Sequence, residues 1–323
     1  MSINQNILGH TLQLSALQND IQTDNVSHAY LFTGPPHIGK FTVAKWFAST
    51  LLTKDIADGE EKKRAEYEVE KLIHPDIFVL DQLWMEDRNE NFDMIAKSSN
   101  IPQQHRMKSK AKTDTISIED VRVLQERLYE IGSGAHRCCL IRSVERMQDE
   151  AVNALLKIVE EPPPGMVFVL TAESAGAVLP TLVSRSRVVE FQRLPQADLS
   201  PLLTDTDPDD AQFMLMIAQG APGVIVALKS SPDTLRTART VHASAVSFWR
   251  SRRLFERLTL LSPIEKRGND SESLLFHLSL ALHADPAEKK GAYGDALMEL
   301  LRGLDTNASR PLLLQRFALA VTP

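Results

Sequence analysis

Short apolar runs alternate with longer amphipathic stretches over the first 191 residues of the chain. The runs are rich in β-branched and aromatic residues, which is typical of buried strands, and the stretches between them repeat apolar residues at a helical period of about 3.6. The five runs are HAYLFTG (28–34), DIFVLD (76–81), RCCLIR (137–142), MVFVLT (166–171) and RVVEF (187–191). Strands that alternate with helices predict an α/β domain with a parallel sheet.

After residue 191 the strand signals stop, and apolar residues keep a helical period to the end of the chain. Breaks at 220–223 and 230–233 divide this helical half into two parts. The pattern predicts an α/β domain over 1–192, a small helical unit over 193–232 and an all-α domain over 233–323. Residues 84–115 are polar and have no period, which predicts a surface excursion within the first domain.

Composition narrows the class of protein further. The net charge of −6 excludes a polycation that coats nucleic acid, so any DNA contact would be local. Cys138 and Cys139 are neighbours in a predicted strand, where successive side chains point to opposite faces, so we expect two core residues and neither a disulfide nor a metal site. A polar N-terminus and the lack of a long apolar stretch lead us to expect a cytoplasmic protein.

A glycine-rich loop carries the first candidate chemistry. Gly34-Pro-Pro-His-Ile-Gly39-Lys40 follows a predicted strand and begins a predicted helix, which is the context of the G-x-x-x-x-G-K phosphate-binding motif. Backbone N–H groups of such a loop bind phosphate oxygens, and the lysine reaches the terminal phosphates. The alternative is a turn that only joins strand to helix, which does not explain a lysine directly after the second glycine.

The residues that would hold Mg²⁺ beside this loop are replaced. Phe41 occupies the position of the metal-binding Ser or Thr, and Thr42 lies one residue later, about 100° further around the helix. The strand CCLI leads into Arg142 and Ser143, where Asp and often Glu would hold the metal and polarise water. We therefore expect no metal-assisted hydrolysis here. Glu145 is a candidate displaced base, but we expect it to be a solvated surface acid.

Two segments are specific enough to indicate a family. They are VERMQDEAVNALLKIVEEPPPG (144–165) and LPTLVSRSR (179–187). With HAYLFTGPP, His74-Pro-Asp76 and ISIEDVRVLQERL, they resemble the clamp-loader AAA+ ATPases of DNA replication. The resemblance covers most of the chain and is densest from 116 to 191. It implies an AAA+ domain, a helical lid and a C-terminal collar, by which subunits assemble into a ring that opens a sliding clamp.

The resemblance also assigns roles to single residues. In the family, a Ser-Arg-Cys motif supplies an arginine finger to the nucleotide of the neighbouring subunit, and Ser184, Arg185 and Ser186 match it here. Thr171 matches the first phosphate sensor, although a threonine at a strand end is also a common structural residue. Val224 stands where the family's lid carries an arginine. Residues 53–73 contain no cysteine, so the zinc module of many bacterial relatives is not expected.

These features predict a non-hydrolysing clamp-loader subunit of the DNA polymerase III holoenzyme. It would supply Arg185 to ATP bound by a neighbouring subunit, need no cofactor of its own, and meet the sliding clamp and primer-template DNA through the complex. Whether its own loop binds nucleotide stays open. One alternative is a motor ATPase of the gamma/tau type that uses Glu145 or Asp149 as an atypical acid. Another is a scaffold in which Arg185 is silent.

A basic patch within the 84–115 excursion has two interpretations. It is either a solvated loop or a weak contact with primer-template DNA, and the lack of base-stacking aromatics favours the first. Its members are Arg106, Lys108, Lys110 and Lys112.

Overall fold

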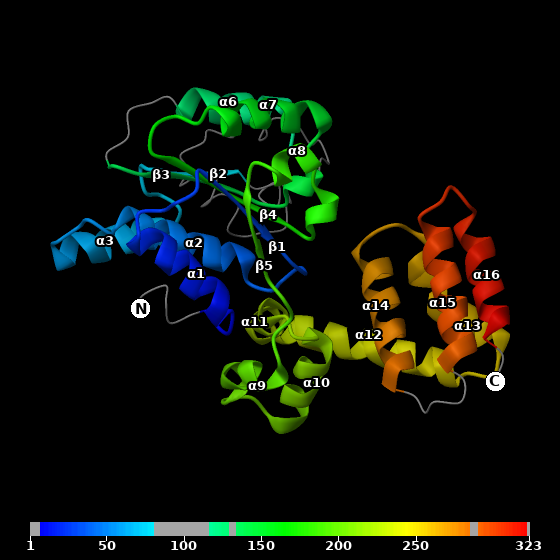
Figure 1. Ribbon diagram of the computed structural model, residues 1–323. Coiled ribbons are helices and arrows are strands. Elements are labelled where there is room, and N and C mark those ends of the chain that lie inside the picture. Colours follow the sequence, from blue (N-terminus) through cyan, green and yellow to red (C-terminus); the bar gives the residue numbers. More distant parts are fainter. Residues whose placement is uncertain (1–6, 81–115, 129–133, 285–289, 322–323) are drawn as a thin grey trace. The chain divides into compact units, whose positions relative to one another are not determined.

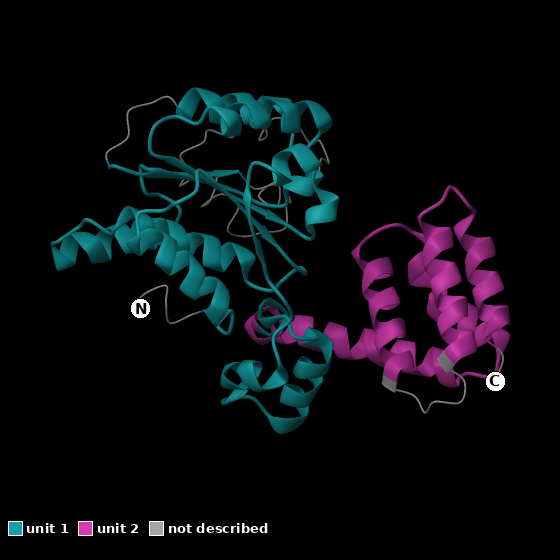
Figure 2. Ribbon diagram, viewed as in Figure 1, with its two compact units in different colours: residues 1–225 teal, residues 226–323 magenta. Residues whose placement is uncertain are grey.

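The computed structural model shows two compact units, Met1–Ile225 and Val226–Pro323 (Figures 1 and 2). The residues that it describes are 7–80, 116–128, 134–284 and 290–321. The domain boundaries predicted at 192 and 232 stay predictions. The predicted 84–115 excursion, with its basic patch, lies outside the described residues.

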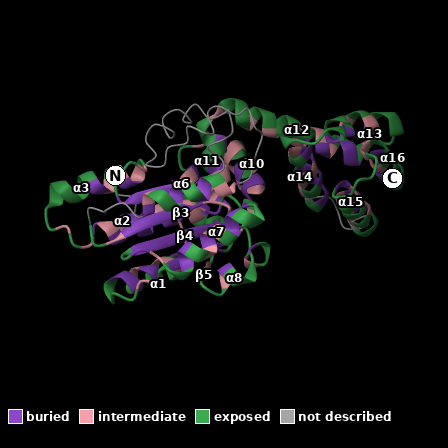
Figure 3. Ribbon diagram, turned by 90° about the horizontal axis from the view of Figure 1, so that it is seen from above, coloured by how far each residue is buried: buried purple, intermediate pink, exposed green. Residues whose placement is uncertain are grey.

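Five parallel strands form the sheet of the first unit, in the order β2-β3-β4-β1-β5. They are β1 (Ala29–Thr33), β2 (Ile77–Leu80), β3 (Arg137–Ile141), β4 (Met166–Ala172) and β5 (Arg187–Glu190). All five apolar runs are therefore strands, and the predicted parallel α/β domain is confirmed. Every residue of β1 to β4 is buried, whereas the edge strand β5 is mostly exposed (Figure 3).

Helices cover both faces of this sheet (Figure 1). On one face lie α1 (Thr11–Gln22) and α2 (Lys40–Leu52), with α3 (Gly59–Glu70) beside α2; on the other lie α6 (Ile118–Leu128) and α7 (Asp149–Glu160). Cys138 packs into the first of the two resulting cores and Cys139 into the second, both fully buried. The prediction of two core cysteines is confirmed, and burial raises the pKa of both thiols.

The helix starts follow from local sequence. Ser117 precedes α6, and both its backbone N–H and its hydroxyl donate to the carboxylate of Asp120, at 2.8 and 3.0 Å. The bond from Ser117 N–H to the Asp120 carboxylate is one half of a capping box. Helix α7 has Asp149 and Glu150 in its first turn, where negative charge complements the helix dipole.

Short helices complete the first unit after the sheet. They are α8 (Pro180–Val183), α9 (Gln196–Leu199), α10 (Pro208–Ala218) and α11 (Pro222–Ser230), the last of which begins in this unit. Gly220 lies between α10 and α11 with a φ of 85°, and its carbonyl accepts a hydrogen bond from Leu194 N–H at 2.9 Å. This backbone bond ties the start of α11 to the chain that leaves β5.

The second unit is helical throughout its described residues, as predicted. Its helices are α12 (Pro232–Arg250), α13 (Leu254–Leu261), α14 (Asn269–Ala284), α15 (Lys290–Leu304) and α16 (Arg310–Ala320). Phe248 stacks on Phe317 with ring centroids 5.2 Å apart, and Trp249 Nε1 donates to Leu278 O at 2.9 Å. Phe248 and Trp249 are thus core residues, while Phe255 is 82% exposed. No described helix is long and apolar enough to cross a membrane.

Candidate functional site

The loop after β1 has the backbone of a phosphate-binding loop. It leads directly into α2, whose first residue is Lys40 and whose N-cap is Gly39, with a φ of 102°. Gly34 has a φ of 146°, and a Cβ there would lie 2.3 Å from the carbonyl oxygen of Phe191. The glycines at both ends of the motif are therefore required by the backbone. The predicted order of strand, loop and helix is present.

Lys40 turns back onto its own loop. Its Nζ donates to the carbonyl oxygen of Gly34 and, at 2.7 Å, to that of Pro35. Burial lowers the pKa of Lys40, and Glu145 and Glu173 oppose this shift. Two of the three N–H donors of the ammonium group are thus engaged within the loop, and one remains for a phosphate oxygen.

Two other segments hold the middle of the loop. His10 Nε2 lies 3.0 Å from the carbonyl oxygen of Ile38, and Gly223 N–H donates to the carbonyl oxygen of His37 at 2.9 Å. A Cβ on Gly223 would lie 2.8 Å from that same oxygen. The start of α11 therefore meets the loop through its backbone. The next residue, Val224, is apolar and offers no cation to the loop.

The two replaced metal-binding positions are in contact with each other. The guanidinium carbon of Arg142 lies 4.7 Å from the ring centroid of Phe41, a cation–π geometry. Arg142 follows β3, Phe41 lies in the first turn of α2, and both side chains are half-buried. A cation and an aromatic ring thus lie side by side where a hydroxyl and a carboxylate would bind Mg²⁺. Thr42, the next residue of α2, is half-buried beside this pair.

Glu145 is not the solvated surface acid that the sequence suggested, and that prediction is wrong. Its carboxyl is half-buried, and no described residue donates to the buried Oε2. Burial raises the pKa of Glu145, Glu173 raises it further, and Lys40 lowers it. The reason is local: Ser143 takes a left-handed φ of 53°, and a single 3-10 turn, η3 (Val144–Arg146), follows it. This turn brings Glu145 back toward Lys40.

Thr171 and Ser143 are also brought together. Ser143 N–H donates to Thr171 Oγ1 at 3.1 Å, across from the end of β3 to the end of β4. Thr171 is buried, so its hydroxyl already accepts a hydrogen bond within the protein. This contact accounts for Thr171 structurally, and its role as a phosphate sensor stays a prediction.

The candidate arginine finger lies between α8 and β5. Arg185 is exposed, donates from Nη1 to Thr181 O at 3.0 Å and forms an ion pair from Nη2 to Glu160 Oε1 at 2.8 Å. Ser184 and Ser186 donate their hydroxyl groups to backbone carbonyls one helical turn earlier, at 3.0 and 2.8 Å. These two serines therefore fix the turn on which the arginine lies.

Strand register separates Arg185 from the loop of its own chain. Tyr30 of β1 pairs with Arg187, the first residue of β5, and Arg185 lies in the turn just before that strand. The loop begins at Gly34, four residues beyond Tyr30, which is about 13 Å at the rise of a β-strand. An arginine side chain is shorter than this distance. Arg185 therefore lies at the opposite end of the sheet from its own phosphate loop.

Arg187 is anchored differently from Arg185. Its Nη1 donates to Asp20 Oδ1 at 2.7 Å, and Tyr30 OH donates to Asp20 Oδ2 at 3.0 Å. Asp20 is 2% exposed, so α1, β1 and β5 meet at one buried carboxylate. Sequence reasoning missed this anchor, because Asp20 and Arg187 are 167 residues apart.

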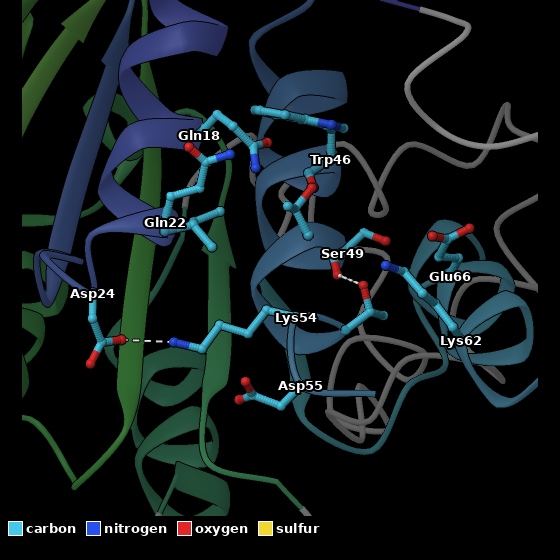
Figure 4. A pocket seen from close by; sticks show the side chains of 12 residues that line it. Gln18, Gln22, Asp24, Trp46, Ser49, Lys54, Asp55, Lys62 and Glu66 are labelled. Carbon is cyan, nitrogen blue, oxygen red and sulfur yellow. Dashed lines mark hydrogen bonds and ion pairs between the residues drawn. The ribbon is translucent and has the colours of Figure 1, made fainter. Parts of the chain in front are cut away.

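A separate hollow lies elsewhere in the first unit. A polar groove of about 670 Å³ runs between α1, α2 and α3, and an ion pair from Lys54 Nζ to Asp24 Oδ1, 2.7 Å long, crosses it (Figure 4). None of the predicted site residues lines it. Among the described residues, no three His, Cys, Asp or Glu side chains converge as metal ligands.

The fold and the phosphate loop define a P-loop protein of the AAA+ class. The family model described as DNA polymerase III, delta subunit, matches residues 9–195, more than half of the chain. The chain therefore belongs to the delta-prime family of clamp-loader subunits.

The chain is similar to relatives of two kinds. The DNA polymerase III subunit delta' of Bacillus subtilis is 26% identical over 198 residues, which are 60% of this chain and 51% of the relative. The subunit gamma/tau of Mycobacterium bovis is 24% identical over 221 residues, 66% of this chain and 34% of the relative. The matches thus span about half of the first relative and a third of the second.

A solved structure shows the same fold. It is a DNA polymerase III gamma subunit-related protein of Thermotoga maritima, with a TM-score of 0.50 and 17% identity. The likeness covers 95% of this chain and 98% of that protein.

Proposed function

We propose that this chain is a clamp-loader subunit that does not hydrolyse nucleotide at its own loop and supplies Arg185 to a nucleotide bound by a neighbouring subunit. The partners are other subunits of the DNA polymerase III clamp loader, joined through the C-terminal collar. The sliding clamp and primer-template DNA are reached through that complex. The chain needs neither zinc nor another cofactor of its own, and the ATP belongs to the neighbour.

The position of Arg185 carries this proposal. The arginine is exposed just before the edge strand β5, whose first residue lies about 13 Å along the strand direction from the start of the chain's own loop. A planar guanidinium suits the spread negative charge of a transferring phosphoryl group, and supply in trans makes hydrolysis depend on assembly. Because Arg185 cannot reach its own nucleotide site, any phosphate that it contacts belongs to another chain.

The Phe41–Arg142 contact supports the absence of hydrolysis. Mg²⁺ at this place would lie beside the guanidinium of Arg142, and neither side chain offers it an oxygen ligand. Lys40 is also bound to the carbonyls of its own loop. We infer that the side chains at the two metal-binding positions form a cation–π pair in place of a metal site.

One observation favours a second candidate, a motor ATPase of the gamma/tau kind. Glu145 is a half-buried acid near Lys40, and burial raises its pKa, which is the setting of many general bases. This candidate predicts Mg²⁺-dependent ATP turnover by the isolated chain that is lost in both Lys40→Ala and Glu145→Gln. Our proposal predicts no such turnover.

The proposal itself is tested in the reconstituted clamp loader. We expect Arg185→Ala to reduce ATP hydrolysis stimulated by clamp and primer-template DNA, because the neighbouring nucleotide loses its guanidinium. Arg64→Ala is the matched control, since Arg64 is an exposed arginine of α3 that pairs only across one helical turn with Glu68. Hydrolysis that is unchanged in Arg185→Ala would favour the scaffold interpretation instead.

A further inference from the structure

Arg185 is held in place by its own chain. One N–H of Nη2 points at Glu160 Oε1, 2.8 Å away, and one N–H of Nη1 donates to Thr181 O at 3.0 Å. A third contact, from Nη1 to Ser184 Oγ, is 3.5 Å long and weak. The side chains of Arg185 and Glu160 are 39% and 45% exposed, so the pair lies at the surface, where another molecule can reach it.

These contacts do not engage all the N–H donors of the Arg185 guanidinium. Arginine has five N–H donors in a fixed plane. At most three point at Glu160, Thr181 and Ser184, so at least two remain for a phosphate oxygen. The ion pair is thus compatible with a finger in working orientation, and it need not break before the finger binds.

The position of Glu160 in its helix is electrostatically unfavourable when no cation lies beside the carboxylate. Glu160 is the last residue of α7, where the negative end of the helix dipole disfavours a carboxylate. Glu161 follows it as the C-cap, is exposed and forms no ion pair with a described residue. Two acids therefore end the same helix, and only one of them contacts Arg185.

We propose that Glu160 is a positioning residue for Arg185, an inference that rests on the proposed function. Glu160 and Thr181 O fix the rotamer of a long side chain that otherwise loses conformational freedom when it binds. The finger is then ordered before the neighbouring subunit arrives. Glu160 touches no substrate, and its effect on the neighbour's nucleotide passes entirely through Arg185.

The test uses the complete clamp loader, with phosphate-loop lysines replaced in every ATPase subunit except the neighbour that faces Arg185. We expect Glu160→Gln to lower the ATP turnover of that neighbour at saturating ATP by about 1.5-fold to fivefold, the range of an exposed ion pair. The KM for ATP stays unchanged, because the finger acts in the transition state. Glu161→Gln, the matched control, keeps the wild-type rate, and Glu160→Asp falls between Glu160→Gln and the wild type.

A double variant separates positioning from a structural role. Glu160→Gln in the Arg185→Ala background has no further effect if Glu160 works through the arginine. An additional loss in that background would overturn the inference, as would a Glu160→Gln rate equal to or above the wild type. A rate that is unchanged in Arg185→Ala refutes the proposed function itself, whereas a loss in Arg185→Ala with none in Glu160→Gln refutes only the role of Glu160.

Discussion

The cation–π contact between Phe41 and Arg142 predicts a measurable coupling between these two side chains. Phe41→Leu removes the ring and keeps an apolar side chain, and Arg142→Met removes the charge and keeps the length. At 4.7 Å between guanidinium carbon and ring centroid, with both side chains half-buried, we expect a coupling free energy of about 1 kcal/mol. The double-mutant cycle isolates this pair from the other contacts of Arg142.

The assay has to report the first unit alone, because a chain of two units need not unfold in a single step. Amide hydrogen exchange of the buried strands β1 and β3 gives the free energy of opening of that unit. We expect the two single variants to lose more stability, when summed, than the double variant loses. A coupling below about 0.3 kcal/mol would refute the pair as a stabilising contact, because cation–π pairs contribute about 0.5 kcal/mol or more.

The same pair can be converted to a metal site. In Phe41→Thr/Arg142→Asp a hydroxyl and a carboxylate replace the ring and the cation, so Mg²⁺ should tighten ATP binding by about tenfold or more. In the wild type we expect Mg²⁺ to bring no such gain. Isothermal titration with and without Mg²⁺ measures both, and a wild-type chain that binds ATP more tightly with Mg²⁺ would contradict the account.

Three further predictions concern stability. Asp20→Ala removes the buried acceptor shared by α1, β1 and β5, and should cost about 2–4 kcal/mol, seen as a lower urea midpoint. Burial lowers the pKa of His277 to about 4, below the unfolded value of 6.5, so the unfolded chain binds more protons between these values. The stability of the second unit should therefore fall, by at most about 3 kcal/mol, as the pH drops from 6.5 to 4. If His277 is the group responsible, the melting temperature of His277→Phe should not change over this pH range. Gly34→Ala places a Cβ 2.3 Å from a carbonyl oxygen at a φ of 146° and should destabilise the first unit by about 2 kcal/mol or more, whereas Gly59→Ala, with nothing within 4 Å, should be tolerated in the same thermal melt.

The fold was predictable because its signals are local. Five apolar runs became five strands, and the alternation of Cys138 and Cys139 between two cores follows from the two-residue period of a strand. Such features need no knowledge of which segments meet in space.

The site was predictable only in part, because its contacts join distant segments. Phe41 and Arg142 were each recognised as replacements, but their contact depends on α2 and the end of β3 meeting at the carboxyl edge of the sheet. Glu145 was misjudged, because the left-handed Ser143 that turns it inward is not a residue type that marks such a turn. A carboxylate at the end of α7, against the helix dipole, was the one local signal of Glu160.

The central claim is that Arg185 of this chain promotes hydrolysis of a nucleotide bound by a neighbouring subunit, and that no hydrolysis takes place at the chain's own loop. Two variants measured side by side in the reconstituted clamp loader test it most directly. We expect Lys40→Ala to leave the ATPase stimulated by clamp and DNA at the wild-type rate, and Arg185→Ala to lower it substantially. The reverse result, a loss in Lys40→Ala and none in Arg185→Ala, would contradict the account.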